Sequence, residues 1–357
     1  MMSRRHRTFP VKVGSVTIGG TAPVTIQSMT NTDTKDTEKT LAQIKDLVEA
    51  GCQLVRVAIP DEESVNSFKT LTQFSPVPLI ADIHFSYQLA IKAIEAGASK
   101  IRINPGNIGS RQRVAKVVEK AKTHNVPIRV GINSGSVEKN LLQKYGGPTP
   151  SALVESAVNN VMMLSEMGFG DVVVSIKASD VNTTVKANQE FATRLPNPLH
   201  LGITEAGTIK QGTIKSSVGI GTLLSHGIGD TLRVSLSGSP IEEVSVARGI
   251  LSSLNLAEGP RIVSCPTCAR SNISVEDLAS TVEDRLKDLN TSLTVAVMGC
   301  EVNGPGEAKE ADIGIAGSKE YGVLFKKGKI IDRVPKNQLL EVLSRAIDEY
   351  IDEIHSK

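Results

Sequence analysis

Eight short runs rich in β-branched residues recur between residues 24 and 237, and they constrain the fold more than any other feature. Their starts are separated by roughly 30 residues, which is the size of one strand–helix unit. Apolar residues at helical spacing, such as Leu41, Ile44 and Leu47, lie between the runs. The runs begin at Val24, Leu54, Pro78, Lys100, Pro127, Val172, Leu199 and Thr231. Eight such units predict an α/β fold of the (β/α)8 TIM-barrel type.

A doubly wound open sheet is the alternative arrangement of such units. It is less favoured because no Gly-x-Gly-x-x-Gly fingerprint follows the first run. The longer spacing after the fifth run predicts an active-face loop over residues 134–150. Residues 11–18 alternate around a Gly-Ser pair, which predicts a hairpin that closes the bottom of the barrel.

The pattern changes after the eighth predicted helix, which covers residues 241–256. We expect a barrel domain over residues 1–257, a linker over 257–260, and a small α+β domain over 261–357. The second domain is expected to contain two strands that each end in a cysteine loop, a helix over 275–289, a hairpin over 322–333 and a last helix over 339–354.

Three cysteines in the second domain form a pattern typical of a metal site. Cys265 and Cys268 are a Cys-x-x-Cys pair, and Cys300 precedes a Gly-Pro-Gly turn that could bring Glu307 back toward it. Clustered thiolates bind zinc or iron–sulfur clusters. No histidine lies between residues 226 and 355, so a cluster with three thiolates and one oxygen ligand or open position is favoured over zinc. Zinc and an unmetallated redox pair remain alternatives.

Cys52 is not expected to join this set. It precedes the second predicted strand, on the bottom of the barrel and away from the end where barrel enzymes place their chemistry. We therefore interpret it as a buried structural thiol.

Cationic residues interrupt the apolar strand runs. Burying an unpaired charge costs several kcal/mol, roughly, so these side chains are expected to share an anionic ligand. Guanidinium groups bind phosphate oxygens in pairs, and a lumen of this kind should hold a diphosphate. Structural ion pairing with Asp82 and Glu205 is the alternative. The cations are Arg56, Arg102, Arg129, Lys177 and Arg233.

Polar residues near the predicted strand ends complete the candidate site. Asp82 and His84 share a face of the third strand, and Glu205 ends the seventh as a candidate proton-transfer group. The other candidates for substrate binding are Asn104, Asn133, Thr204 and Ser235.

The composition disfavours several classes of binding partner. The net charge is +2, tryptophan is absent and aromatic residues make up 3%, which disfavours binding of single-stranded nucleic acid by stacking. No apolar stretch is long enough to span a membrane. The basic start has no apolar run after it. Cysteines spaced like metal ligands, without a disulfide framework, favour a location in the reducing cytoplasm.

Several longer motifs carry a resemblance to a known family. Thr-Asn-Thr-Asp, Ala-Asp-Ile-His-Phe, Ile-Arg-Ile-Asn-Pro-Gly-Asn-Ile-Gly, Gly-Ile-Asn-Ser-Gly-Ser and both cysteine motifs together resemble the 4-hydroxy-3-methylbut-2-enyl diphosphate synthases of the non-mevalonate isoprenoid pathway. The resemblance runs along essentially the whole chain and points to the short two-domain type.

That resemblance implies a reaction and a cofactor. The implied cofactor is a [4Fe–4S] cluster bound by Cys265, Cys268, Cys300 and Glu307. The implied reaction is the two-electron ring opening of 2-C-methyl-D-erythritol 2,4-cyclodiphosphate with loss of water, with electrons from ferredoxin or flavodoxin. In this reading a substrate oxygen displaces Glu307 at the unique iron, and Glu205 is the expected proton donor.

The length of the linker predicts how the two domains work together. The eighth helix of a barrel returns the chain to the bottom face, and four linker residues span at most about 14 Å. We therefore expect a homodimer in which each cluster acts in trans on the partner's barrel, as the resemblance also implies. The rival interpretations are a non-redox barrel enzyme for a phosphate substrate with a structural zinc site, and a non-catalytic binding module.

Overall fold

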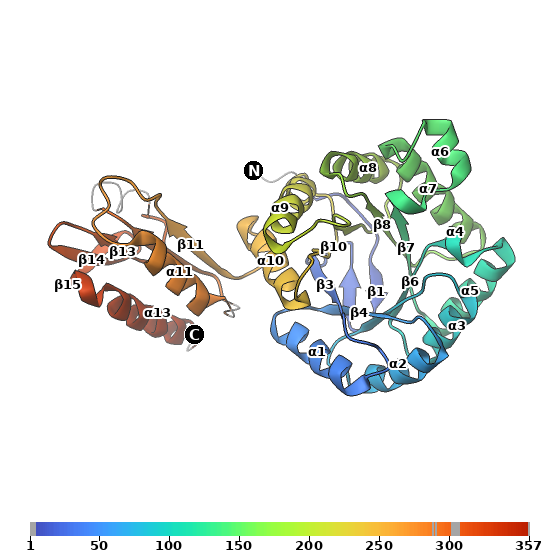
Figure 1. Cartoon of the computed structure of the whole chain (residues 1–357), viewed down its shortest axis with the longest axis horizontal. Coiled ribbons are helices and arrows are strands. Elements are labelled where there is room, and N and C mark those ends of the chain that lie inside the picture. Colours follow the sequence, from blue (N-terminus) through green and yellow to red (C-terminus); the bar gives the residue numbers. More distant parts are fainter. Residues whose placement is uncertain (1–4, 288, 290, 301–307, 356–357) are drawn as a thin grey trace. The chain divides into compact units, whose positions relative to one another are not determined.

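The structure is a computed structural model that describes residues 5–287, 289, 291–300 and 308–355. The chain divides into two compact units, Met1–Leu256 and Ala257–Lys357 (Figure 1). Within the described residues, no helix is long and apolar enough to cross a membrane.

The first unit is the predicted (β/α)8 barrel. Its eight strands pair in parallel in the order β8-β7-β6-β5-β4-β3-β10-β9, and a parallel bridge between Val174 and Leu199 joins β8 to β9 and closes the sheet. All eight predicted strands are present, although β9 and β10 are short. The bounds are β3 Thr25–Met29, β4 Leu54–Ala58, β5 Leu79–Asp82, β6 Lys100–Ile103, β7 Ile128–Asn133, β8 Val172–Lys177, β9 His200–Leu201 and β10 Thr231–Leu232.

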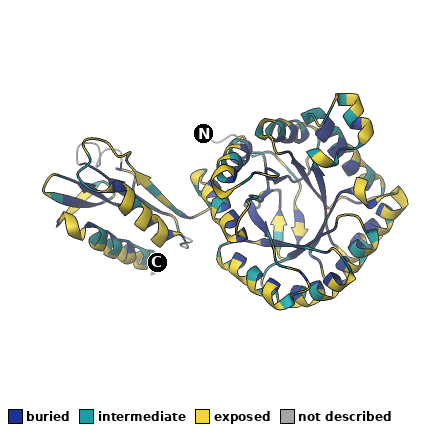
Figure 2. Cartoon of the chain, viewed as in Figure 1, coloured by how far each residue is buried: buried dark blue, intermediate teal, exposed yellow. Residues whose placement is uncertain are grey.

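Helices surround the barrel and bury one face each against it (Figure 2). Several begin at a side-chain cap, such as Asp36, whose carboxylate accepts the backbone N–H of Lys39 at the start of α1. The bounds are α1 Thr37–Glu49, α2 Glu62–Phe74, α3 Tyr87–Glu95, α4 Pro105–Ile108, α5 Arg111–His124, α6 Lys139–Tyr145, α7 Pro150–Glu166, α8 Val181–Arg194, α9 Ile209–Ser225 and α10 Pro240–Ser253.

The predicted N-terminal hairpin closes the bottom of the barrel. Its strands β1 (Val11–Val13) and β2 (Val16–Ile18) pair antiparallel. Their buried side chains form one apolar cluster with Leu54, Ile80 and Val173 from three barrel strands. The lumen therefore has an apolar floor at the N-terminal end of the strands.

Residues 134–150 are not the open loop that the spacing predicts. They contain a short 3-10 helix, Ser134–Ser136, and α6, before α7 begins at Pro150. The buried side chain of Leu141 attaches α6 to the core. Glu155 of α7 accepts hydrogen bonds from Lys144 and Tyr145. These contacts explain the helix, which is too short to show a clear apolar period.

The second unit is the expected α+β domain. Five strands pair in the order β11-β12-β13-β14-β15, with the first three parallel and the last two antiparallel. Helices α11 and α13 pack on one face around Val295, Val297 and Ile315. The bounds are β11 Pro260–Ser264, α11 Val275–Leu286, β12 Leu293–Met298, β13 Ile313–Gly317, β14 Tyr321–Lys326, β15 Lys329–Pro335 and α13 Leu339–His355.

Candidate functional site

A polar pocket lies at the C-terminal end of the barrel strands. Five of its lining side chains are cationic and one is a carboxylate, so its described lining is strongly positive. Most of the residues predicted as a binding set contribute to it. The lining consists of Arg56, Asp82, His84, Arg102, Arg129, Asn133, Ser175, Lys177, Thr204, Arg233 and Ser235.

The strand pleat points these side chains inward, and two glycines leave room for them. A Cβ at Gly131 would lie 2.7 Å from Nε of Arg102, and one at Gly202 would lie 2.5 Å from Nζ of Lys177. Both distances are too short for a real Cβ. The lumen therefore accommodates two long cations because β7 and the segment after β9 carry no side chain at these points.

Asp82 is the carboxylate among these cations. Its side chain is almost fully buried and lies 3.5 Å from Nη1 of Arg102, 4.0 Å from Nε of Arg56 and 3.8 Å from Nε2 of His84. Burial by itself would raise the pKa of Asp82, but the charges of Arg56, Arg102 and Arg129 outweigh it and hold the pKa below its ordinary value. Asp82 is therefore ionised at neutral pH and forms ion pairs with two arginines.

A second carboxylate, Glu243, holds Arg233 and was not predicted. Its two oxygens accept from Nε and Nη2 of Arg233 at 3.1 and 2.9 Å, and it also accepts from Ser28 Oγ and the backbone N–H of Leu236. Glu243 is buried on α10. The sequence holds no strong signal for it, because a single glutamate in an amphipathic helix is normally a surface residue.

Arg129 and Lys177 are the least compensated cations of the pocket. Arg129 is 1% exposed, and its Nε and Nη1 have no hydrogen-bonding partner in the described part of the chain. Burial and the neighbouring charges of Arg129 and Arg56 lower the pKa of Lys177 well below its ordinary value. An anion in the pocket would offset both effects, because it supplies acceptors to Arg129 and favours protonated Lys177.

Three further polar residues of the lumen were not predicted. Ser175 lines the pocket two positions before Lys177 on β8. Lys100 and His200 are fully buried, and neither Nζ of Lys100 nor either ring nitrogen of His200 has a hydrogen-bonding partner among the described residues. Alternation along β6 and β8 could have indicated Lys100 and Ser175, since each lies two positions before a predicted cation.

Two predicted residues lie beside the pocket rather than in its lining. The carboxamide oxygen of Asn104 accepts the backbone N–H of Gly106 at the start of α4, and the residue is buried. Glu205 follows the lining residue Thr204, is exposed, and has a left-handed backbone with φ 52°. Such a conformation costs about 1 kcal/mol or more for a residue other than glycine, and it is frequent at functional sites.

In the second unit, β-strand pairing brings the two cysteine loops together. Ser264 and Val297 are partners in the parallel ladder of β11 and β12, so Cys265 and Cys300 follow neighbouring strand ends. The backbone N–H of Gly299 donates to Sγ of Cys265 at 3.0 Å, and that of Asn272 donates to the carbonyl of Gly299 at 2.8 Å. The loops are therefore linked by one N–H···S hydrogen bond and one backbone hydrogen bond.

The chemistry of these thiols suits a metal cluster. Cys268 is exposed, and a hydrogen bond from the backbone of Arg270 lowers its pKa, which favours the thiolate that binds metal. The N–H group directed at Cys265 is of the kind that stabilises ligating sulfur. Within the described residues no three His, Cys, Asp or Glu side chains converge on one point, and Glu307 lies outside those residues. The donor set fits a thiolate-bound cluster.

Cys52 behaves as the buried thiol that its position predicts. It is 2% exposed, accepts the backbone N–H of Ser28 and donates to the carbonyl of Leu54. Burial raises its pKa to about 12, so it stays protonated and unreactive at neutral pH.

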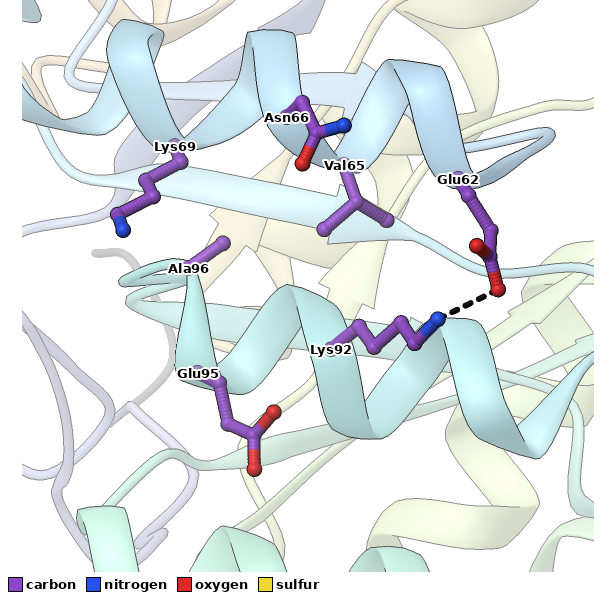
Figure 3. A pocket seen from close by; sticks show the side chains of 7 residues that line it. All are labelled: Glu62, Val65, Asn66, Lys69, Lys92, Glu95 and Ala96. Atoms are coloured by element: carbon purple, nitrogen blue, oxygen red, sulfur yellow. Dashed lines mark hydrogen bonds and ion pairs between the residues drawn. The ribbon is translucent and has the colours of Figure 1, made fainter.

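A shallow groove on the flank of the barrel is unlike the strand-end pocket. It lies between α2 and α3, where Lys92 pairs with Glu62 across the two helices (Figure 3). Glu95, Lys69 and the small apolar residues complete a lining whose charges balance. The groove has neither the buried cations nor the strand-end position of a catalytic pocket.

The charge balance of the strand-end pocket yields a first prediction. Asp82→Asn should destabilise the protein by about 3 kcal/mol at pH 7, because two buried arginines lose their carboxylate. The pKa of Asp82 is depressed in the folded state, so its stabilising effect is present above its unfolded pKa of about 4 and disappears as the pH falls through the folded pKa. Urea unfolding at several pH values should show the deficit of the variant shrinking below about pH 4. A constant deficit would contradict the ionised state of Asp82.

Comparison with known families covers both units of the chain. Residues 8–248 match a family described as GcpE TIM-barrel domain, and residues 261–349 match the GcpE protein C-terminal domain. Relatives named 4-hydroxy-3-methylbut-2-en-1-yl diphosphate synthase (flavodoxin) align along nearly the whole chain. The one from Caldanaerobacter subterraneus is 55% identical over 99% of this chain and 100% of its own length. That from Bacillus subtilis is 51% identical over 100% of this chain and 95% of its own.

Two solved structures of other enzymes are similar over about 70% of this chain. A dihydropteroate synthase from Stenotrophomonas maltophilia superposes with a TM-score of 0.52 at 13% identity, over 69% of this chain and 97% of its own. A 3-dehydroquinate dehydratase from Geobacillus kaustophilus gives 0.51 at 16% identity, over 71% of this chain and 98% of its own. At such low identity the likeness supports the barrel fold alone.

Proposed function

Because the chain belongs to the GcpE family along both of its units, we propose that its strand-end pocket binds the cyclic diphosphate on which that family acts. The chain is an enzyme of isoprenoid biosynthesis that forms 4-hydroxy-3-methylbut-2-enyl diphosphate from 2-C-methyl-D-erythritol 2,4-cyclodiphosphate. The relatives are named as flavodoxin-dependent enzymes, so we propose flavodoxin, rather than ferredoxin, as the electron donor. The rival non-redox barrel with a structural zinc site finds no support in these comparisons.

The observation that best supports the proposed diphosphate site is the uncompensated positive charge of the pocket. Arg129 has buried donors without partners, and a diphosphate offers acceptor oxygens in the geometry that guanidinium groups prefer. Arg56 and Arg102 lie at ion-pair distance from Asp82, and Arg233 is hydrogen-bonded to Glu243, so carboxylates hold these cations in place without the ligand. The pocket is thus preorganised for a doubly phosphorylated small molecule.

The reaction also needs protons. Opening the ring and releasing one water consumes two electrons and two protons, as the formulas of substrate and products require. Glu205 is our candidate donor of a proton to the leaving hydroxyl, because it lies at the pocket rim next to Thr204 in a strained backbone conformation. His84, half exposed and in reach of Asp82, is placed to bind a phosphate oxygen at the same rim.

The second unit supplies the electrons. Enzymes of the GcpE family carry a [4Fe–4S] cluster, which when bound passes electrons one at a time. We assign Cys265, Cys268 and Cys300 as its thiolate ligands on the basis of their neighbouring loops and their sulfur-directed N–H groups. Glu307 is the proposed fourth ligand, since it completes the motif that begins at Cys300. Under this assignment residues 261–357 are the cluster domain and residues 1–257 the substrate domain.

The visible spectrum of the anaerobically purified protein tests this cofactor. A broad brown absorbance with about four irons and four sulfides per chain is expected. A colourless protein that contains stoichiometric zinc would overturn the assignment and would restore the structural-zinc alternative.

We further propose that the functional unit is a homodimer in which the cluster of one chain serves the barrel of the other. Helix α10 has 14 residues and is therefore about 21 Å long. It runs from the strand-end face toward the opposite face of the barrel. The four residues from Ala257 to Pro260 span at most about 14 Å, which is shorter than the return path to the chain's own pocket.

Mixing two inactive variants tests the trans arrangement. Arg129→Ala weakens a barrel function and Cys300→Ser removes a cluster function, so each homodimer should be nearly inactive at low substrate concentration. After subunit exchange, half of the dimers contain one complete site, and activity should return to about a quarter of the wild-type value. Verified exchange without recovery would show that the barrel and the cluster of one chain work together.

A further inference from the structure

The barrel lumen contains a level of polar side chains beneath the strand-end pocket. Lys100 lies two positions before the pocket residue Arg102 on β6, and its ladder partner on β5 is the floor residue Ile80. Gln27 on β3 likewise pairs with the floor residue Leu54. Side chains two positions apart point to the same face of a strand, so this level lies between the apolar floor and the pocket. We name it the buried polar level, and it consists of Gln27, Lys100 and the ladder partners His200 and Thr231.

Each member of the buried polar level has side-chain polar atoms without a hydrogen-bonding partner. The four residues are at most 1% exposed. Within the described residues, no partner contacts Nζ of Lys100, either ring nitrogen of His200, either carboxamide atom of Gln27 or Oγ1 of Thr231. The interior layers of a barrel are normally filled by valine, isoleucine and leucine, and a buried polar group without a partner destabilises the fold. A level that is unfavourable in the empty barrel therefore indicates a role in binding.

Lys100 is the member whose charge can change most readily. Burial and the positive charges of Arg129 and Arg56 lower its pKa well below the ordinary value. Burial and the same cations also lower the pKa of His200, so its imidazole stays neutral and keeps one nitrogen as an acceptor. The hairpin below contributes only apolar side chains to the floor. The other charged or titratable groups around the lumen are Asp82 and His84 at the end of β5, Arg102 on β6, Lys177 on β8, and Arg233 on β10 with its partner Glu243.

We propose that Lys100 takes up a proton from solvent when the diphosphate binds above it, and so adds a positive charge to the site only when a ligand is present. The inference rests on the proposed diphosphate site. The five cations that line the empty pocket favour the neutral amine of Lys100, whereas the negative charges of a bound diphosphate favour its ammonium form. No bond other than the new N–H changes in this step.

A lysine suits this role better than another arginine. Arginine stays charged in every state of a protein, so a sixth arginine would repel the five cations of the empty pocket. Opening the ring of the substrate frees one phosphate oxygen, and the diphosphate can then carry one more negative charge than the cyclic form. A group that gains a proton can follow this change. Lys100 is thus a charge-compensating residue that lies outside the pocket lining and does not touch the substrate.

Calorimetric titration measures the protons that are taken up on binding. The oxidised holoenzyme is titrated anaerobically with 2-C-methyl-D-erythritol 2,4-cyclodiphosphate in two buffers of different ionisation enthalpy, from about pH 6 to about pH 9. Without reduced flavodoxin the ligand is not turned over. Lys100→Met replaces the amine by a thioether of similar size. Where the two differ most, the wild type should take up about half a proton or more per ligand beyond the uptake of Lys100→Met.

The pH dependence of affinity separates this role from a structural one. Protonated Lys100 strengthens binding, so its contribution is full at low pH and disappears as the pH rises through the pKa of Lys100 in the complex. The dissociation constant of Lys100→Met should therefore be about tenfold above that of the wild type at the acidic end of the range, and equal to it at the alkaline end. A deficit of the same size at every pH would overturn the inference.

Gln27→Met is the matched control, because it removes an unpartnered polar group from the same level without removing a titratable one. It should keep the wild-type proton uptake. Iron content and a cooperative melting transition show that both variants are folded. Equal proton uptake by the wild type and Lys100→Met, or the same loss in Gln27→Met, would overturn the inference and leave the proposed reaction intact. A wild-type holoenzyme that leaves the cyclic diphosphate unbound in equilibrium dialysis would remove the diphosphate site itself, and the inference with it.

Discussion

Cys300→Ser should abolish turnover and most of the visible absorbance of the purified protein, which is the largest effect expected from a single substitution. Cys300 follows β12 beside the Cys265 loop, so its loss removes one of three proposed thiolates. A serine hydroxyl is a much poorer ligand for iron, because it is hardly ionised at neutral pH. Iron and sulfide analysis together with an anaerobic activity assay measure both effects.

Cys52→Ser is the matched control for that substitution. It also exchanges sulfur for oxygen, but at a buried thiol held by Ser28 and Leu54 that does not line the pocket. It should keep the iron and the activity, and lose only some stability. A Cys52→Ser protein without iron, or a Cys300→Ser protein with a complete cluster, would contradict the ligand assignment.

Arg129→Met should lower kcat/KM tenfold to a hundredfold while the melting temperature stays the same or rises. A charge-assisted hydrogen bond to phosphate contributes about 1.5–3 kcal/mol, which corresponds to that loss. Arg129 is also buried among Arg56 and Arg102 with unpartnered donors, so the empty protein gains from its removal. Methionine fills much of the same volume without a charge.

Steady-state kinetics measures the expected loss of kcat/KM, and calorimetry measures the unchanged or higher melting temperature. Arg194→Met is the control, since Arg194 pairs with Glu190 on the surface of α8, and it should change neither quantity by much. An Arg129→Met protein with wild-type kcat/KM would place Arg129 outside the binding site. A large loss of stability would show that its charge is already compensated.

The barrel could be predicted from sequence because its strands are buried on both faces. Such strands appear in the sequence as continuous β-branched runs. A cationic residue inside such a run is unusual, so the cations of the pocket could also be recognised from the sequence. Their inward direction follows from the pleat alone. Arg56, Arg102, Arg129, Lys177 and Arg233 all line the one pocket.

Features that depend on contacts distant in sequence could not be predicted. Glu243 meets Arg233 only because α10 packs back over the end of β10. Helix α6 is held by Glu155 of the next helix, so residues 134–150 resembled a loop.

Anaerobic turnover is the measurement that tests the central claim most directly. The reconstituted protein, reduced flavodoxin and 2-C-methyl-D-erythritol 2,4-cyclodiphosphate should yield 4-hydroxy-3-methylbut-2-enyl diphosphate, with two flavodoxin electrons consumed per product. Cys300→Ser should form none, and Arg129→Met should form it slowly at low substrate concentration. If the wild-type protein with a complete cluster leaves the cyclic diphosphate unchanged while flavodoxin stays reduced, the account of this site is wrong.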